Sequence, residues 1–327
     1  MACHFTDTGA PQSGLFLMVR RGQNPAKFVD GVGKAERITL ALITYAPFLG
    51  GYYSQTLQVL EACLQSIRAT TKVPYDLLVF DNGSCAEVQS YLMKGKSSGW
   101  IQYLFLSEKN LGKGGAWNLI FSAAPGEIIS YSDSDVIFFE GWLERSLEIL
   151  ETFPKVGMVT ARPFRSPPSL ASHTIAWGER TEGVTFRRGQ LIPWEVLAEM
   201  DLGLGQSEEE VRRRYERSED ILLTLSGVSA FVGASHWQFS APKEVLKSLL
   251  PFQVEAPMGN VRQLDRAVNE AGYLRLMVTD PLVRHVGNCL TGWERRRSGA
   301  RRRRLRDLPL LRRCLLYVHD RIFRLYH

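Results

Sequence analysis

An alternation of apolar, β-prone stretches with helical stretches from Arg37 onward limits the folds open to this chain more than any other feature. The expected strands are Ile38–Thr44, Tyr75–Phe80, Ile101–Leu106 and Ile128–Ser132, and the expected helices are Gln55–Thr70, Glu87–Met93 and Ala116–Ala123. Strands separated by helices are typical of a doubly wound α/β fold, in which helices cover both faces of the sheet. The sequence therefore predicts an α/β fold with a mixed sheet flanked by helices.

The pattern changes after Pro163. Residues 166–220 read as loop followed by a charged helix, and the expected elements beyond them are a buried strand over Ile221–Val232, a helix over Gly259–Ala271 and a strand over Leu274–Val278. We divide the chain into an N-terminal extension (1–36, in which Leu15–Val19 could form one strand), a first half (37–160), a second half (161–293) and a tail (294–327).

The positive charge of the chain is concentrated in this tail. The net charge is +6, and an arginine cluster alternates with leucines at roughly helical spacing after Arg295. A basic amphipathic helix of this kind can lie on an anionic membrane surface, or it can pack on the body or on a partner chain. We expect no nucleic-acid binding, because no aromatic-rich basic surface accompanies the cluster.

Cysteine usage and hydropathy bear on the compartment. The five cysteines have no metal-like spacing, and neither a signal peptide nor an apolar run long enough to span a membrane is visible. We predict a cytoplasmic protein, with a peripheral position on the inner face of a membrane if the tail binds there.

Polar motifs follow the ends of the four expected strands of the first half. They are Thr44-Tyr45, Asp81-Asn82-Gly83-Ser84, Asn110 to Gly115, and Asp133-Ser134-Asp135. In doubly wound sheets, ligands bind beyond the carboxyl ends of the strands. Convergence of the four motifs at one edge predicts a ligand site there.

Asp133 and Asp135 are the candidate metal ligands of this site. Hard divalent ions prefer oxygen ligands and often take phosphate oxygens and water for the rest of their shell, so a strand-end Asp-x-Asp suits Mg²⁺ or Mn²⁺ held against a diphosphate. His285 heads the turn His-Val-Gly-Asn and is a candidate third ligand, in which case the set suits Mn²⁺ at least as well. The alternatives are a helix cap and an ion pair for the acids and a structural role for the histidine.

Two further motifs have both a functional and a plain reading. Asp81 could accept the N3–H of a uracil, although Asp-Asn-Gly-Ser also suits a turn without a ligand. Lys113, in the glycine-rich stretch 112–115, could neutralise a diphosphate or remain an exposed loop lysine. The stretch lacks the Gly-Lys-Ser/Thr ending of a P-loop and the strict GxGxxG pattern of a dinucleotide site.

Taken in order, these motifs resemble the inverting glycosyltransferases of family 2, which have the GT-A (Rossmann-like) fold. The matching pieces lie within residues 37–290 and also include Ile43, Gly114-Gly115-Ala116, Asn118, Ala271-Gly272-Tyr273 and His285-Val286-Gly287-Asn288. The resemblance implies a metal-dependent enzyme that moves a sugar from a nucleotide-diphosphate donor, with UDP favoured, to the hydroxyl of a glycan or lipid-linked acceptor.

The resemblance also implies residue roles. Donor-binding residues would be Thr44, Tyr45, Asp81, Asn110, Gly112, Lys113, Asn118 and Asp133, and metal ligands would be Asp133, Asp135 and His285. Asp265 would be the general base that an inverting transfer requires. It can equally be a helix-surface acid paired with Arg262 or Arg266, and Glu255 and Asp220 are further candidates.

The chain also departs from the family pattern. A Glu-Asp pair is common before the helix that ends at Ala-Gly-Tyr, whereas this chain has Leu264-Asp265, seven residues before Gly272. Thr-Tyr-Ala-Pro follows the first strand where Tyr-Asn is common. His236 and Trp237 are candidate acceptor contacts, although Trp237, like Trp177, Trp194 and Trp293, could instead be core.

Two other functions remain open at this point. A nucleotidyltransferase also uses an α/β sheet and metal-binding acids, but it normally has a basic glycine-rich loop after the first strand, and residues 46–51 contain no basic side chain. A non-catalytic sugar-nucleotide-binding protein could share the fold, although the presence of Asp133, Asp135 and His285 together favours catalysis.

Overall fold

The structure is a computed structural model that describes residues 22–203, 205–254, 256, 261–290 and 321. Two units are distinguished, residues 1–34 and residues 35–327. In the first unit the described residues form one short 3-10 helix, η1 (Pro25–Phe28), and no side chain of that helix is buried. The expected strand over Leu15–Val19, Glu255, Trp293 and the tail apart from Arg321 lie outside the described residues.

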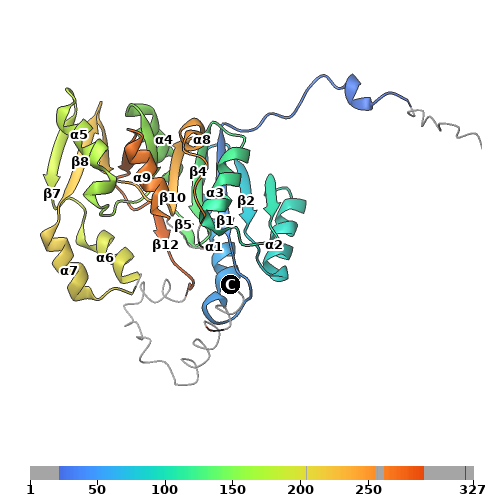
Figure 1. Cartoon of the computed structure of the whole chain (residues 1–327), viewed down its shortest axis with the longest axis horizontal. Coiled ribbons are helices and arrows are strands. Elements are labelled where there is room, and N and C mark those ends of the chain that lie inside the picture. The colour runs from blue at the N-terminus through green and yellow to red at the C-terminus, as the bar shows by residue number, and fades with distance from the viewer. Residues whose placement is uncertain (1–21, 204, 255, 257–260, 291–320, 322–327) are drawn as a thin grey trace, which may run out of the picture. The chain divides into compact units, whose positions relative to one another are not determined.

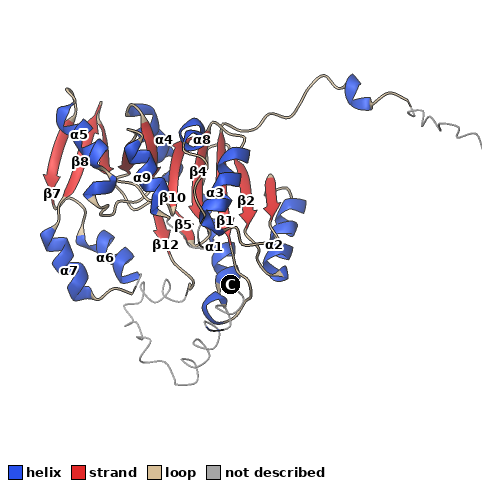
Figure 2. Cartoon of the chain, viewed as in Figure 1, coloured by secondary structure: helices blue, strands red, loops and turns tan. Residues whose placement is uncertain are grey.

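The second unit is built on one large mixed sheet (Figures 1 and 2). Within the described residues its strands lie in the order β3-β2-β1-β4-β10-β6-β11-β9-β8-β7. The strands β1 (Ile38–Thr44), β2 (Asp76–Asp81), β3 (Tyr103–Leu106) and β4 (Ile128–Asp133) pair in parallel. Parallel strands with helices on both faces are buried on both sides, which explains why β1 reads as a nearly continuous apolar run.

Two hydrophobic clusters lie against this sheet, and each belongs to a different set of helices. The helices α1 (Thr56–Thr70), α2 (Ala86–Ser97) and α4 (Trp142–Thr152) contribute to one cluster, with Leu60, Leu92 and Leu143 among its members. The helices α3 (Gly112–Ala123), α8 (Lys243–Ser248) and α9 (Arg262–Glu270) contribute to the other. Full burial of an apolar side chain such as Leu60 contributes about 1.5–3 kcal/mol. The predicted α/β sheet flanked by helices is confirmed.

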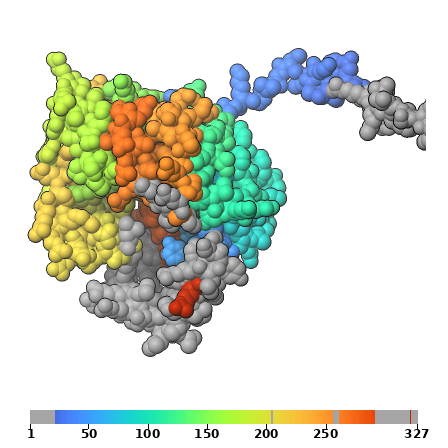
Figure 3. All heavy atoms as spheres, viewed as in Figure 1, coloured from blue at the N-terminus to red at the C-terminus, as the bar shows by residue number. Residues whose placement is uncertain are grey.

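The rest of the sheet contains strands of both directions. The strands β6 (Val156–Thr160) and β11 (Leu274–Met277) are parallel to each other, whereas β10 (Gln238–Pro242) is inserted between β4 and β6 and is antiparallel to both. A separate two-stranded sheet joins β5 (Val136–Phe138) to β12 (Val283–His285). Figure 3 shows the segment from β10 to α9, in orange, between the green first half and the yellow segment that contains α7.

Several expected elements of the second half need correction. The segment Ile221–Val232 is not one strand but a hairpin of β8 (Asp220–Leu225) and β9 (Val228–Val232), because Ser226 and Gly227 adopt the positive φ angles of a turn. The segment 166–220, expected to be loop and one helix, also contains 3-10 helix η3 (Pro168–Leu170), α5 (Ser172–Arg180), β7 (Thr185–Gly189) and α6 (Trp194–Gly203) before α7 (Glu208–Arg217).

Among the helices that the structure describes, none combines enough length with enough apolar character to cross a bilayer.

Candidate functional site

A cavity of about 520 Å³ opens beyond the carboxyl ends of β1 and β4. Its lining includes Thr44 and Tyr45 after β1, Asn110 and Lys113 at the start of α3, and the segment 133–135 after β4. Three of the four strand-end motifs therefore meet at one edge of the sheet, as the order of the motifs predicts. The fourth contributes Asn82, whereas Asp81 is not among the lining residues.

The acid at the end of β4 is held by two donors. Asp133 Oδ2 lies 2.6 Å from Lys113 Nζ, and Asp133 Oδ1 accepts a hydrogen bond of 2.8 Å from the Tyr131 hydroxyl. The side chains of Lys113 and Asp133 are only 13% and 20% exposed, so the pair is poorly hydrated. Lys113 also lines the cavity, and its expected role at a diphosphate stays a prediction.

The second acid of the motif contacts the predicted histidine. The pairing of β12 with β5 sets His285 opposite Val136, and His285 Nε2 lies 3.3 Å from Asp135 Oδ2. Asp135 Oδ1 is buried and has no hydrogen-bond partner within the described part of the chain. Burial raises the pKa of Asp135, and the nearby His285 opposes this rise.

The predicted set of three metal ligands does not assemble as a whole. Asp135 and His285 are in contact, while Asp133 is turned toward Lys113 and Tyr131. Across the described ranges, no group of three or more His, Cys, Asp or Glu side chains is arranged to hold a metal ion. An unpartnered carboxylate oxygen beside an imidazole nitrogen nevertheless suits a divalent cation that takes its other ligands from phosphate and water.

The start of α3 is shaped by an asparagine network. Asn110 Oδ1 accepts hydrogen bonds from Gly112 N at 2.8 Å and from Asn82 Nδ2 at 3.0 Å, and Asn82 Oδ1 accepts from Leu111 N at 2.9 Å. Gly112 has φ of +67° and is the first residue of the helix. The glycine-rich stretch is thus the first turn of α3 and not a loop before it, which brings Lys113 to the cavity.

Two predicted donor residues have their polar groups engaged elsewhere. Asp81 is fully buried, and its carboxylate accepts from Ser84 N and from Gln89 Nε2 at 3.1 Å. Burial raises the pKa of Asp81, and these hydrogen bonds oppose the rise. Asn118 exchanges hydrogen bonds of 2.7 and 3.0 Å with the backbone of Phe252. Both side chains support the walls of the site and do not line the cavity.

Sequence reasoning missed an aromatic wall. The side chains of Tyr45, Phe48, Tyr52 and Tyr53 line one side of the cavity, and the rings of Tyr45 and Phe48 lie 6.1 and 5.5 Å from that of Tyr53. Tyr53 belongs to the 3-10 helix η2 (Gly51–Tyr53). Four aromatic residues within nine positions after the first strand were a visible signal for this wall.

The wall is tied to the segment that follows His285. Asn288 Nδ2 donates a hydrogen bond of 2.8 Å to Tyr52 O, and Leu290 N donates one of 3.1 Å to Gln55 Oε1. Burial raises the pKa of Tyr45, and a hydrogen bond with Asn110 opposes it.

The predicted base and acceptor residues form a second group beside the cavity. Asp265 on α9 is buried and contacts His236 and Arg275. Trp237 is 7% exposed, and its ring lies 5.7 Å from that of His285. Trp177 and Trp194 pack against other aromatic rings, those of Phe153 and Tyr215.

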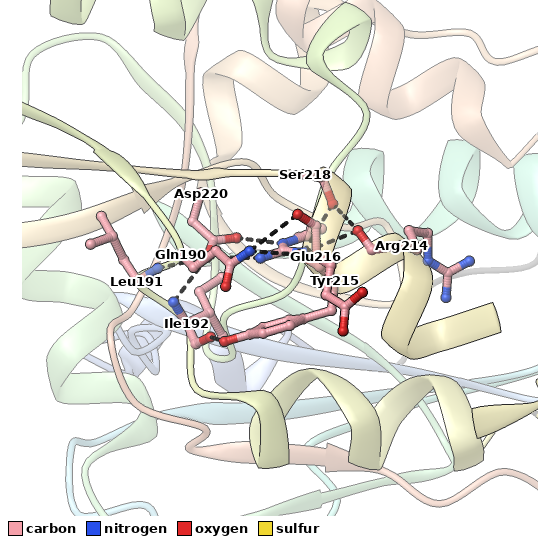
Figure 4. Close-up of polar contacts among 9 residues, drawn as sticks. Gln190, Leu191, Ile192, Arg214, Tyr215, Glu216, Ser218 and Asp220 are labelled. Carbon is pink, nitrogen blue, oxygen red and sulfur yellow. Dashed lines mark hydrogen bonds and ion pairs between the residues drawn. The ribbon is translucent and has the colours of Figure 1, made fainter. Parts of the chain in front are cut away.

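The alternative base Asp220 is fully engaged. Its carboxylate accepts from Arg165 Nε at 2.8 Å and from the backbone N–H groups of Leu191 and Ile192, each at 2.9 Å (Figure 4). Its side chain is 1% exposed. Asp220 therefore joins β8 to the segment before α6, and a substrate hydroxyl has no access to its oxygens.

Residues 52–200 match the family model for glycosyl transferase family 2. An uncharacterized glycosyltransferase of Nostoc sp. (strain PCC 7120) is 26% identical over 100 residues. This match covers 31% of the chain and 31% of the relative, so the chain spans about a third of the length of the curated relative that it matches.

Solved structures are similar at low sequence identity. The mannosyltransferase PcManGT from Pyrobaculum calidifontis, in complex with GDP-Man and Mn²⁺, is 15% identical with a TM-score of 0.44, and the match covers 76% of this chain and 56% of that one. GalNAc-T7 with UDP, GalNAc and Mn²⁺ is 12% identical with a TM-score of 0.47, and the match covers 77% and 44% of the two chains.

Proposed function

We propose that this chain, whose residues 52–200 match the family model for glycosyl transferase family 2, transfers a sugar from a nucleotide-diphosphate donor to an acceptor hydroxyl with the help of a divalent metal ion. The observation that carries the proposal is the meeting of Asp133, Asp135 and Lys113 at one cavity beyond the parallel strands. Ligands of open α/β sheets bind at this edge. A cavity of about 520 Å³ also falls within the range of roughly 300–1,000 Å³ that is typical of small-molecule sites.

Asp135 and His285 would hold the metal ion. Their contact and the unpartnered Asp135 Oδ1 support this assignment, and Mn²⁺ or Mg²⁺ would complete its shell with diphosphate oxygens and water. When bound, the ion would neutralise the charge that develops on the leaving diphosphate. We place Asp133 at the ribose or phosphate side of the donor, where it orients Lys113.

Lys113 would bind the diphosphate. Its ammonium group is fixed by Asp133 at 2.6 Å and lies 5.6 Å from the centre of the Trp117 ring. A cation that is held in place at low exposure attracts a phosphate more strongly than one that moves in bulk water. When the donor binds, the Lys113 ammonium group would leave Asp133 and pair with the diphosphate oxygens instead.

The nucleoside would occupy the part of the cavity between β1 and the aromatic wall. The Thr44 hydroxyl is buried without a partner among the described residues, so it has a hydrogen bond to give to a ribose or a base. Tyr45 and Asn110 line the same region, and Phe48 and Tyr52 offer rings on which a base can stack. We favour UDP as the carrier.

The acceptor would approach from the side of His236 and Trp237. We propose a glycan or a lipid-linked glycan as acceptor and a direct displacement that inverts the anomeric carbon. Such a displacement needs a base that takes the acceptor proton, on the side of the sugar opposite the leaving diphosphate.

A thermal-shift panel tests the donor site. UDP-, GDP-, dTDP- and CMP-linked sugars are added with and without Mn²⁺ to the wild type and to Asp135→Ala. A ligand that binds only the native state raises the melting temperature, by the equivalent of about 2.7 kcal/mol at 100 times its Kd. We expect a metal-dependent rise with one base that is lost in Asp135→Ala. The absence of a rise with every nucleotide would contradict the proposal.

A further inference from the structure

A chain of three charged or polar side chains leads from the interior of the sheet to the surface beside the cavity. Arg275 on β11 is 0% exposed, and its Nη2 lies 2.6 Å from Asp265 Oδ1. Asp265 Oδ2 lies 2.6 Å from His236 Nδ1. The side chain of Asp265 is 4% exposed and that of His236 is 19% exposed, so the imidazole is the member that reaches solvent.

This order of contacts decides which atom is available to a substrate. Both carboxylate oxygens of Asp265 are engaged, one by Arg275 and the other by His236. A neutral imidazole that donates its Nδ1–H to Asp265 carries the free lone pair on Nε2. No hydrogen bond to His236 Nε2 occurs among the described residues.

Arg275 explains how the buried Asp265 carboxylate can hold the His236 imidazole in place. A buried charge needs a partner and hydrogen bonds, and Arg275 supplies both to Asp265. The guanidinium is fixed in turn by the carbonyl oxygens of Leu170 and Ala234. The carboxylate that faces His236 is therefore held in one position by rigid elements, β11 and α9.

His236 lies next to the donor region and outside the cavity itself. The residue that follows it, Trp237, accepts a hydrogen bond of 2.8 Å from Asp133 N at its carbonyl oxygen. The imidazole packs edge-on against Trp117, with ring centres 6.3 Å apart, and Lys113 lies over the same indole. His236 thus shares the Trp117 ring with Lys113, which lines the cavity, but is not itself a lining residue.

We propose that His236, and not Asp265, is the base that takes the proton from the acceptor, and that Asp265 is its positioning residue. This inference rests on the proposed function. The Nε2 lone pair would take the hydroxyl proton, and the electron pair of the O–H bond would form the new bond to the anomeric carbon. The bond from that carbon to the diphosphate oxygen breaks and its electron pair leaves with the diphosphate. The imidazolium then returns the proton to solvent.

The structure explains why sequence reasoning arrived at Asp265. The acid lies on the helix that the family pattern indicates, but its carboxylate is 4% exposed and faces the imidazole. His236 is 29 positions earlier in the chain, so only the tertiary fold joins the two residues. The choice of Asp265 as the direct base stays a prediction, and the test below separates it from the choice of His236.

The test compares binding with turnover in three variants. His236→Gln keeps a side chain that can donate to Asp265 but cannot take a proton, and Asp265→Asn keeps the shape of the positioning residue. The matched control is His173→Gln, a partly exposed histidine of α5 that borders the far end of α9, near Gly272. Release of nucleoside diphosphate is measured with UDP-glucose, UDP-N-acetylglucosamine and GDP-mannose in the presence of Mn²⁺. Binding of UDP and GDP is measured by thermal shift.

We expect His236→Gln to keep the nucleotide-induced thermal shift and to lose turnover by about 10²–10⁴-fold, the usual contribution of a general base. Asp265→Asn should lower kcat and leave KM for the donor unchanged, and His173→Gln should match the wild type. In a fourth variant, His236→Ala, added imidazole should restore part of the turnover.

Three results would overturn the inference, and they can be told apart. Turnover of His236→Gln within threefold of the wild type would exclude His236 as the base, and a much larger loss in Asp265→Asn would then favour Asp265. Loss of the thermal shift together with turnover would indicate a structural role. A wild type that neither binds nucleotides nor turns over any donor would instead contradict the proposed function on which the inference rests.

Discussion

Replacement of Arg275 by methionine should destabilise the protein strongly, because it leaves the Asp265 carboxylate buried without a counter-charge. Arg275 is 0% exposed, and its contact with Asp265 measures 2.6 Å. Removal of one partner of a buried ion pair costs about 3–5 kcal/mol, whereas replacement of both by apolar groups is often close to neutral. Methionine fills much of the arginine volume, so the loss of the charge should account for most of the effect.

The expected destabilisation of Arg275→Met corresponds to a lower melting temperature. A chain of this size loses about 2 °C per kcal/mol, so a destabilisation of about 4 kcal/mol lowers Tm by about 8 °C. Urea unfolding followed by circular dichroism measures the same free energy independently. Arg188→Met is the matched control, because its ion pair with Glu179 is half exposed on both sides. That pair should contribute at most about 1 kcal/mol.

A double variant tests the physical cause. In Arg275→Met/Asp265→Leu the uncompensated charge is absent, so its destabilisation should be clearly smaller than the sum of the two single values, with a coupling of about 1–3 kcal/mol. A Tm of Arg275→Met within 2 °C of the control variant would refute the reasoning that the buried carboxylate depends on this arginine. Strict additivity of the two substitutions would refute it as well.

Two further predictions concern the start of α3. Lys113→Met removes the cation held by Asp133. It should weaken UDP binding in the presence of Mn²⁺ by about tenfold, a loss of roughly 1.4 kcal/mol, as measured by calorimetry. Equal affinity in the variant and the wild type would contradict a role of Lys113 in donor binding. Gly114→Ala should destabilise by about 1–3 kcal/mol, because its methyl group would lie 2.9 Å from Gln253 O. Gly33→Ala, where nothing lies within 4 Å, is the control for a thermal melt, and equal Tm values for the two variants would contradict the predicted close packing.

The elements from β1 to β4 could be predicted because their signals are local, whereas β5, α4 and β6 are not among the expected elements. Strand β1 is buried on both faces and reads as an apolar run, and β1 and β4 end in the polar residues Thr44 and Asp133. Helix α1 begins within one residue of its expected start. The pairing of Asp135 with His285 agrees with the motifs, although the third expected ligand, Asp133, pairs with Lys113 instead.

The strand order of the second half could not be predicted, because it depends on contacts distant in sequence, although α9 and β11 themselves lie where a helix and a strand are expected. Strand β10 is short and enters the sheet between β4 and β6, a position set by pairing with residues more than 70 positions away. The hydrogen-bond partners of buried polar side chains cannot be seen in a single sequence either. The hydrogen bonds of Asp81 with Ser84 and Gln89, and of Asn118 with Phe252, redirect two residues that the motifs assign to the donor.

The most direct measurement of the central claim is the release of nucleoside diphosphate from nucleotide sugars by the wild type and by Asp135→Ala, in Mn²⁺ and in excess chelator. A donor cavity with Asp135 and His285 beside it predicts Mn²⁺-dependent release from one class of nucleotide sugar by the wild type. The variant and the chelated enzyme should both lose this activity. Release that persists unchanged in Asp135→Ala, or no release from any nucleotide sugar, would contradict the account.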